Sequence, residues 1–557
     1  MNQRTPMKQS AHTNTGTLCR LALLLALAVG AVMGLALQAS ADPPRYRIIV
    51  IDPPDGVEPD AVGGSTMGIN NRGEVVGAYL EGFSYSPLVW LPARNANYND
   101  SAGLAPGTHA LPVERPGFVA NKINVNGFVV GKGVPSNGGT SSWLWNLNLA
   151  LPDCGSLIES LSCSDCGTLH QHKEEALDIN DDNPPVIVGS AWIQYSPFEQ
   201  RGFRMALGQA AEELDPILSI NVWTARAVSN TGFVVGNGTH SENGIEECGQ
   251  PQDVLRAVAW DGGTILAENL STLGTSIAET FTVPEGVNNA SPEMIVGWGE
   301  DPNDLTLPCR HRALFWENAM AEPMALPFLT VNGQPLTEDA MQANAIADVF
   351  AGGTIEAVGH SSGLQAGVLW RRVSNAWEAI DLNTIAPCGG AEWTNVSHAY
   401  DINACGWIAG RGMLTDGTPR IFVLIPVDAC PGDITGSEVT YPDGKVNVND
   451  LLGVIAKWAT SDCVADITGD STVNVSDLLA VINGWGTCAC FPAQAAVESL
   501  SQELTNAGLT QGNWNEYLEV AVNGTQSQKE LYNCWMQRLM SGCTSCPSCS
   551  GRNPFGN

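Results

Sequence analysis

The stretch GINNRGEVVG, residues 68–77, decides the fold because versions of it return six more times along the chain. Their closing glycines lie 47 to 62 residues apart, a spacing typical of repeats that build propellers or arrays. The other copies are KINVNGFVVG at 122–131, DINDDNPPVIVG at 178–189, AVSNTGFVVG at 227–236, GVNNASPEMIVG at 286–297, AIADVFAGGTIEAVG at 345–359 and DINACGWIAG at 401–410.

Each copy continues into a second short apolar run that follows a polar stretch rich in glycine, serine and proline. In the third and seventh copies this run is GFRMALG or RIFVLIP, and in the other five it carries a tryptophan. Asn-x-x-Gly is a turn signal, and short apolar runs after turns predict strands. Helical periodicity is nearly absent, so the region is predicted to be all-β. The five tryptophans are Trp90, Trp145, Trp260, Trp316 and Trp370.

The opening strand, RYRIIVID at 45–52, suggests how the repeats close. It resembles the element AIDLNTI at 379–385, which follows the second apolar run of the sixth copy. If this strand completes the last repeat, the ring closes without an exposed edge. We therefore expect residues 42–427 to form a seven-bladed β-propeller. An open β-solenoid, capped at both ends, is the alternative.

These seven copies resemble the HAF family of extracellular repeats, known mainly from bacterial secreted proteins. The resemblance covers about residues 45–427 and depends on the recurrence of a short motif. It implies a propeller-like binding or scaffold module and no particular activity. As our own hypothesis, such a module would bind a glycan or a protein.

The N-terminal segment predicts export. Basic residues precede the apolar run LALLLALAVGAVMGLAL, which ends in ASAD, so residues 1–41 are interpreted as a signal peptide cleaved before Asp42. A retained membrane anchor is the alternative. The formal net charge of −32 disfavours nucleic acid and anionic membrane surfaces as partners. No second membrane span is expected after cleavage.

The 16 cysteines favour disulfides in an exported chain. Cys388 with Cys405 is one plausible pair, but spacing does not determine the connectivity. The cluster CTSCPSC at 543–549 is interpreted as disulfide-forming rather than as a metal knuckle, because no matching second pair or histidine follows it.

Two related loops near residues 433 and 466 predict calcium binding. Calcium takes six to eight oxygen ligands, and alternate positions of a tight loop can direct oxygens inward. The first loop fits if SEVTYP at 437–442 is treated as a bulge. The predicted ligands are Asp433, Thr435, Asp443, the Lys445 carbonyl, Asn447 and Asp450 in the first loop, and Asp466, Thr468, Asp470, the Thr472 carbonyl, Asn474 and Asp477 in the second.

Each loop leads into one helix, DLLGVIAKW or DLLAVINGW, and has aspartate at position twelve where an EF-hand has glutamate. Residues 428–490 thus resemble a type I dockerin, which implies two Ca²⁺ sites and docking to a cohesin-like protein or a cell-surface partner. The resemblance assigns partner selection to Val448 with Asn449 and Val475 with Ser476.

Three features depart from that pattern. Threonine occupies position three of both loops, Ser471 stands where glycine is preferred, and the bulge interrupts the first loop. Because only the first loop is interrupted, the second loop fits a Ca²⁺ site better. The helices carry matched apolar residues, and their leucines and tryptophans are predicted to form the core of a hairpin. An acidic helical hairpin without metal is the alternative. Residues 491–557 are expected to form a helical, cysteine-rich tail of unassigned function.

A catalytic site is not evident in the sequence. GHSSG at 359–363 matches a nucleophile elbow around Ser361, but it enters a glycine-rich turn rather than a helix. Two hypotheses remain. The preferred one is a secreted, non-enzymatic binding or scaffold protein, linked to polysaccharide utilisation. The other is a dockerin-targeted polysaccharide-degrading enzyme whose acids lie in the propeller, since a pair of acids from different blades leaves no local signature.

Overall fold

The computed structural model describes residues 46–487 apart from a set of loops. Within this part of the chain, no helix is long and apolar enough to cross a bilayer. The predicted signal, the tail and every cysteine except Cys405 lie outside the description. The residues not described are 1–45, 58–65, 82, 93–106, 135–139, 150–154, 158–173, 195–198, 216–219, 241–245, 248–249, 252–253, 262–266, 270–281, 301–310, 338, 349–353, 374, 386–392, 427–431, 435–444, 461–463, 469–471 and 488–557.

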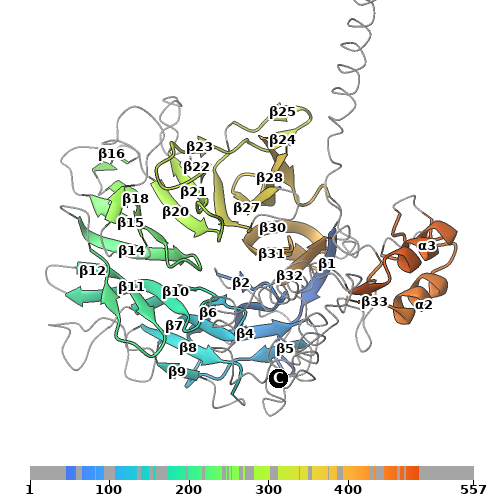
Figure 1. Cartoon of the computed structure of the whole chain (residues 1–557), viewed down its shortest axis with the longest axis horizontal. Helices are drawn as coiled ribbons and strands as arrows, with labels where there is room; N and C mark the ends of the chain where they lie inside the picture. Colours follow the sequence, from blue (N-terminus) through green and yellow to red (C-terminus); the bar gives the residue numbers. More distant parts are fainter. Residues whose placement is uncertain are drawn as a thin grey trace, which may run out of the picture. The chain divides into compact units, whose positions relative to one another are not determined.

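Seven blades of four antiparallel strands form a β-propeller, which confirms the predicted fold (Figure 1). The first three blades comprise β2 (Gly68–Ile69), β3 (Val75–Glu81), β4 (Ser84–Leu91) and β5 (Gly107–Ala110); β6 (Phe118–Ile123), β7 (Phe128–Gly133), β8 (Ser141–Asn146) and β9 (Gly155–Leu157); and β10 (Glu174–Ile179), β11 (Val186–Gln194), β12 (Glu199–Ala206) and β13 (Glu212–Glu213).

The remaining blades continue the same order. They comprise β14 (Ile220–Val228), β15 (Val234–His240), β18 (Val254–Trp260) and β19 (Ala267–Asn269); β20 (Thr282–Val287), β21 (Ile295–Glu300), β22 (His311–Trp316) and β23 (Met324–Ala325); β26 (Met341–Ile346), β27 (Ile355–Ser361), β28 (Ala366–Val373) and β29 (Ala376–Asp381); and β30 (Trp393–Ile402), β31 (Ile408–Leu414) and β32 (Pro419–Pro426) with β1 (Tyr46–Ile51). Two further hairpins are β16 (Glu246–Glu247) with β17 (Gln250–Pro251) and β24 (Thr330–Val331) with β25 (Gln334–Pro335).

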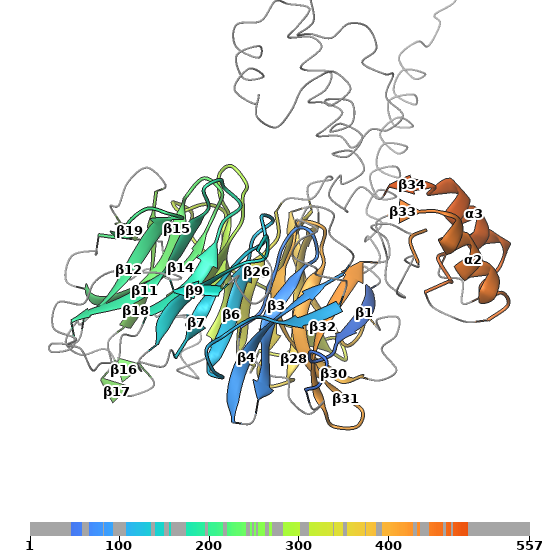
Figure 2. The same cartoon turned by 90° about the horizontal axis from the view of Figure 1, so that it is seen from below.

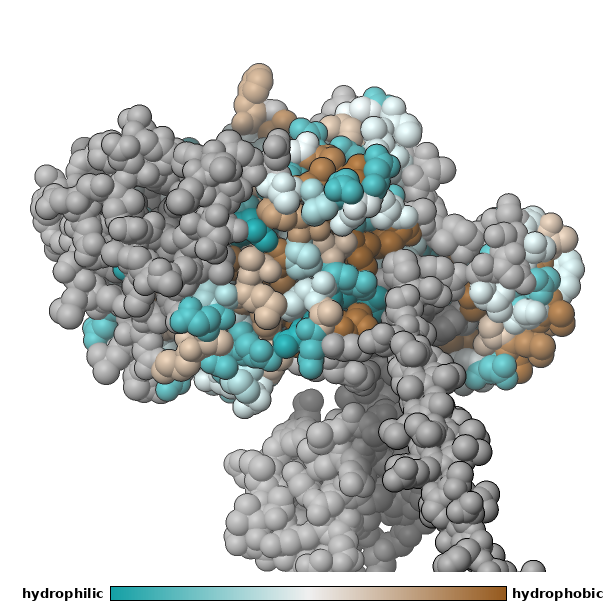
Figure 3. Space-filling model, turned by 90° about the horizontal axis from the view of Figure 1, so that it is seen from above, coloured by the Kyte–Doolittle hydropathy of each residue, from teal (hydrophilic) through white to brown (hydrophobic). Residues whose placement is uncertain are grey.

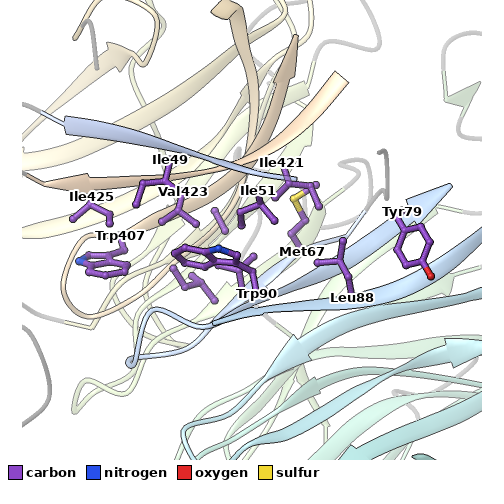
Figure 4. Close-up of a cluster of buried hydrophobic side chains, with 13 residues drawn as sticks. Ile49, Ile51, Met67, Tyr79, Leu88, Trp90, Trp407, Ile421, Val423 and Ile425 are labelled. Carbon is purple, nitrogen blue, oxygen red and sulfur yellow. The ribbon is translucent and has the colours of Figure 1, made fainter. Parts of the chain in front are cut away.

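The first strand closes the ring as predicted. β1 pairs antiparallel with β32, from Tyr46 opposite Pro426 to Ile51 opposite Ile421. The alternating side chains of β1 then enter one buried cluster with residues of β3, β4, β31 and β32, including Trp90 and Trp407 (Figure 4). Both edges of the repeat array are thereby paired, so the open solenoid is wrong.

Neighbouring blades pack face to face, as the edge-on arrangement of β3, β4, β6 and β7 in Figure 2 shows. Large apolar side chains fill the space between them. The repeat tryptophans are all buried. Three of their indole nitrogens donate to a carbonyl of the segment entering the blade: Trp145 to Pro112, Trp260 to Asp215 and Trp370 to Pro327. Each such indole therefore secures the preceding connection as well as filling the core.

The motif asparagine holds its own turn and the next blade together. In the first blade, Asn70 Oδ1 accepts from the amides of Arg72 and Glu74, while Nδ2 donates to the Asn124 carbonyl at 2.9 Å. Equivalent inter-blade bonds run from Asn124 to the Asn180 carbonyl and from Asn180 to the Ser229 carbonyl. One asparagine side chain thus forms an Asx turn and a joint between blades.

Two short helices follow the propeller in sequence: α2 (Val448–Ala456) and α3 (Val475–Asn483). Asn447 and Asn474 are their N-caps, and each forms a capping box with the aspartate three residues later. The strands β33 (Lys445–Val446) and β34 (Gly486–Thr487) pair with each other. A small core between the helices contains Val454 and Val481 together with apolar residues of the loops.

Candidate functional site

A β-bulge in the innermost strand of six blades brings two successive residues to a central cavity. In β6, for example, Ala120 pairs with Gly131 and Lys122 pairs with Val130, which leaves Asn121 as the extra residue. Bulges re-aim side chains in this way. The same register shift occurs at Leu177, Arg226, Glu285, Asn344 and Tyr400.

The closing glycine of the repeat makes room for this bulge. A Cβ on Gly236 would overlap the carbonyl oxygen of Thr224 in the bulged strand. The corresponding glycines of the second, third, fifth, sixth and seventh copies would meet the same obstacle. Gly77 differs, because the atoms nearest to its Cβ would be side-chain atoms of Ile421 at 3.2 Å and Met67 at 3.4 Å. The repeat thus retains glycine where two backbones approach closely.

The cavity has a volume of about 510 Å³ and is lined from all seven blades. Its lining is asymmetric at the position two residues before the motif asparagine. Lys122, Asp178 and Asp401 occupy this position in the second, third and seventh blades. Small residues occupy this position in the fourth, fifth and sixth blades, where the lining also includes the longer side chains of Arg226, Glu285 and Asn344 at the bulges. The small residues are Ala227, Gly286 and Ala345.

Lys122 and Asp401 form the first charged contact. The Lys122 ammonium lies 2.6 Å from Asp401 Oδ2, and the same carboxylate accepts from the Ile69 amide at 2.8 Å. Burial disfavours the ammonium, but the carboxylates of Asp401 and Asp178 outweigh it and raise the pKa of Lys122. Glycine is required at position 68 because a Cβ would come within 2.8 Å of Lys122 Cα.

Asp178 is buried next to this pair, with 8% of its surface exposed. Its oxygens accept from the backbone amides of Ile179 at 2.9 Å and Val228 at 2.8 Å. Burial raises the pKa of Asp178 to about 6, although the Lys122 charge and these hydrogen bonds oppose the shift. A carboxyl group of this kind changes charge near neutral pH.

Three rings from the sixth and seventh blades form a stack. The centroids of His360 and His398 lie 4.5 Å apart, and those of His398 and Tyr400 lie 5.8 Å apart. Burial, together with the charge of Arg411, lowers the pKa of both imidazoles, to about 4 for His398. Both histidines are therefore neutral at pH 7 and add no positive charge to the cavity.

The predicted calcium ligands Asp450 and Asp477 lie in the first turns of α2 and α3. Asp450 Oδ1 accepts from the Ile434 amide at 2.8 Å, and Asp477 Oδ1 accepts from the Thr468 amide at 2.9 Å and from the Thr468 hydroxyl at 3.0 Å. Although burial opposes it, these bonds hold the pKa of Asp477 below its usual range. Buried aspartates at positions one and twelve of each loop supply hard oxygens of the kind that calcium takes.

Other predicted ligands have identified partners or lie outside the description. The Asn447 and Asn474 side chains cap their helices by accepting from the amides two residues later, and the Thr472 carbonyl accepts from Asn474 Nδ2 at 2.8 Å. Lys445 belongs to β33. Among the described residues no three His, Cys, Asp or Glu side chains gather to hold a metal ion. Thr435, Asp443 and Asp470 are not described.

The predicted partner positions Val448, Asn449, Val475 and Ser476 are all exposed in the first turns of the helices. The expectation that the helix leucines and tryptophans form the core is wrong in part. Leu451 and Leu478 pack against the core, whereas Leu452, Leu479, Trp458 and Trp485 are 47 to 56% exposed. Valines and loop residues fill this small core, so the exposed leucines and both tryptophans lie outside it.

Ser361 is not a nucleophile. It ends β27, it is fully buried, and its hydroxyl donates to Asp339, which also accepts from the Gly363 amide. The hydroxyl therefore stabilises the turn between β27 and β28. This agrees with rejecting the elbow motif from the sequence.

No protein-family model and no curated protein matches the sequence. Among solved structures, the β-propeller domain of the Trilobed protease from Pyrococcus furiosus is 11% identical, with a TM-score of 0.38, and the match covers 65% of this chain and 95% of that one.

Two further structures are similar at the same level. A puromycin-hydrolysing peptidase from Mycobacterium tuberculosis is 11% identical, with a TM-score of 0.40 and coverage of 68% of this chain and 54% of that one. The BP39L lectin from Burkholderia pseudomallei is 9% identical, with a TM-score of 0.34 and coverage of 65% and 96%. Because peptidases and a lectin match equally, no activity is transferred from them.

Proposed function

We propose that this chain is a secreted binding protein with two working parts. The propeller holds a ligand, a glycan or part of a protein, in its central cavity. The helix pair, folded around two Ca²⁺ ions, docks the protein to a cohesin-like or cell-surface partner in a system that uses polysaccharides. The observation that carries this proposal is a matched set of exposed apolar residues on α2 and α3.

We name these residues the paired stripes. The residues of each stripe follow one another at intervals of four, three and three. The three within the helix therefore lie along one side of it, and the tryptophan follows just beyond the helix end. All eight are 47 to 56% exposed, and brown apolar residues are visible on this part of the chain in Figure 3. The first stripe is Val448, Leu452, Ile455 and Trp458, and the second is Val475, Leu479, Ile482 and Trp485.

Two arguments favour docking over an inert surface. Eight large, half-exposed apolar side chains, six on the two nine-residue helices and two just beyond the helix ends, form a surface that is normally covered by a partner. Aromatic residues such as Trp458 and Trp485 also dominate the binding energy of protein interfaces. Because each helix begins at a predicted calcium loop, metal binding is expected to fix the orientation of both stripes.

The experiment uses the full chain as bait for the secreted proteins of its native host, with calcium or with EDTA. We expect one partner to be retained in calcium and released by EDTA. The double variant Leu452→Glu/Leu479→Glu should lose the partner, while Met413→Glu, an exposed apolar residue of the propeller, should keep it. Retention that is indifferent to EDTA and to the double variant would contradict the proposal.

A second candidate is a polysaccharide-degrading enzyme with its active site in the propeller. Asp178, with its pKa near 6, and the ion-paired Asp401 face the same cavity. Two carboxyl groups in different environments are the arrangement that acid and base roles require. Polysaccharide turnover by the full chain that Asp178→Asn abolishes would establish this activity, and the absence of turnover would leave the binding role.

A further inference from the structure

We propose that the central cavity is a binding site for a small organic cation, a solute that bears a primary ammonium group beside hydroxyl groups, with the Asp178 carboxylate as its anchor. This inference rests on the proposed binding role of the propeller and names the chemical class of its ligand. Four observations carry it: the charge of the lining, the environment of Asp178, the open side of the cavity and the available amide groups.

The lining contains more carboxylates than basic groups. Among the described residues that line it, the positively charged side chains are Lys122 and Arg226, since His360 and His398 are neutral at pH 7. Lys122 pairs with Asp401, and Arg226 Nη1 lies 2.8 Å from Glu285 Oε2. Three further carboxylates line the same cavity without an ion pair of 4 Å or less in the described part of the chain. They are Asp178, Asp181 and Asp348. Such a lining attracts cations and repels anions.

Among these three, Asp178 is the one placed to anchor a ligand. Asp181 and Asp348 lie in the turns that follow β10 and β26. They accept hydrogen bonds from the amides of Val125 and Asn289 in neighbouring blades. Asp178 lies deeper, and each of its oxygens accepts one backbone amide and retains capacity for another donor. A buried carboxylate without a close counter-ion is unfavourable, and an incoming ammonium group would relieve this cost.

Space for the rest of the ligand lies on the other side of the cavity. The position that carries Lys122, Asp178 and Asp401 in three blades carries only Ala227, Gly286 and Ala345 in the fourth to sixth blades. The volume of about 510 Å³ falls within the usual range for small-molecule sites, about 300–1,000 Å³.

The hydroxyl groups of a ligand in this space could bind the side-chain amide of Asn344. Asn344 Nδ2 donates to the Ala399 carbonyl, and in the described region its Oδ1 has no donor, so it can accept from a ligand hydroxyl. A metal ion fits less well, because the Lys122 ammonium already lies beside the acidic groups. The features together select a cationic, hydroxyl-bearing solute such as an amino sugar.

The test compares 6-amino-6-deoxyglucose with glucose, a matched pair that differs in one ammonium group. Calorimetric titration of the full chain at pH 7.5 is expected to give at least tenfold tighter binding of the amino sugar. Asp178→Asn should weaken the affinity for the amino sugar at least tenfold. Asp416→Asn, which changes an exposed acid of the β31–β32 turn, should leave it unchanged. Circular dichroism verifies that both variants fold.

A pH series of the wild-type chain keeps the inference testable if Asp178→Asn does not fold. The groups facing Asp178 are Lys122 from β6 and Asp401 from β30, while Arg226 of β14 is paired with Glu285. As Asp178 takes up a proton near pH 6, affinity for the amino sugar should fall about tenfold between pH 7.5 and pH 5.

Equal affinity for the two sugars, no binding of either, or binding that is insensitive to both Asp178→Asn and pH would overturn the inference. The partner-capture experiment is independent of it. Calcium-dependent capture without cation binding removes only the cavity inference, and cation binding without capture removes only the docking proposal.

Discussion

Asn403 Nδ2 donates to the carbonyl oxygen of Asn70 at 2.9 Å and so joins two residues 333 positions apart in sequence. This bond lies where the last blade meets the first, beside the pairing of β1 with β32. It is the same bond that Asn70 makes to Asn124 one blade further on. The ring is therefore closed by the repeat's own contact as well as by an added strand.

Replacing Asn403 with alanine is expected to destabilise the propeller by about 3 kcal/mol. The change leaves the amides of Cys405 and Trp407 and the Asn70 carbonyl without their side-chain partner, and buried groups of this kind cost about 1–3 kcal/mol each when unsatisfied. Asp416→Ala, which removes exposed hydrogen bonds from the amide and the side chain of Thr418, is the control. Urea unfolding followed by circular dichroism measures both, and equal midpoints would refute the role of Asn403.

The closing glycine gives a second test within the repeat. Gly236→Ala should destabilise the fold by about 2–3 kcal/mol because the new Cβ would meet the Thr224 carbonyl. Gly77→Ala is the matched change in the first blade, where the nearest atom is the end of the Ile421 side chain at 3.2 Å, and it should cost under about 1 kcal/mol. The bulge explanation fails if the two variants unfold at the same urea concentration.

Asp178 predicts a pH dependence of stability. Its pKa is raised from 3.8 to about 6 in the folded chain, so between these values the folded state binds more protons than the unfolded state. Its contribution to stability is therefore present at low pH and is lost as pH rises toward 6. Asparagine does not ionise. The free energy of unfolding of Asp178→Asn, relative to that of the wild type, should therefore rise by up to about 3 kcal/mol between pH 4 and pH 7. A constant difference over this range would contradict the assigned cause.

The helix pair predicts opposite effects for two neighbouring substitutions. Trp485 is 54% exposed whereas Val481 is fully buried. Trp485→Ala should therefore change the stability of the helices by less than about 1 kcal/mol, while Val481→Ala should cost about 2 kcal/mol through a cavity. Partner capture should show the reverse order. If Trp485→Ala unfolds the helices, this tryptophan belongs to the core and the paired stripes are wrongly defined.

The sequence predicted the propeller and its closing strand because both depend on a repeated pattern. The asparagine and glycine of each copy, and the likeness of residues 45–52 to 379–385, are visible without coordinates. The residues that line the central cavity were not predicted. Its lining depends on a bulge that changes the register by one residue, and no separate residue type marks a bulge of this kind.

A signal for the cavity was nevertheless present in the sequence. Lys122, Asp178 and Asp401 each begin a copy of the motif, where other copies begin with glycine or alanine. For α2 and α3, by contrast, the sequence pattern led to a wrong prediction. Apolar periodicity predicted a core for Trp458 and Trp485, yet two nine-residue helices bury only one valine each completely. Periodicity identifies an apolar face but does not say whether the chain itself covers it.

Calcium binding by the full chain tests the central claim most directly. Calorimetric titration should detect two bound Ca²⁺ ions, the tighter one lost in Asp477→Ala and the weaker one lost in Asp450→Ala, because each change removes the carboxylate at position twelve. Asp416→Ala, in the propeller, should leave both ions bound. If the wild-type chain binds no calcium, or if Asp477→Ala and Asp450→Ala bind as many ions as the wild type, the proposed docking module is contradicted.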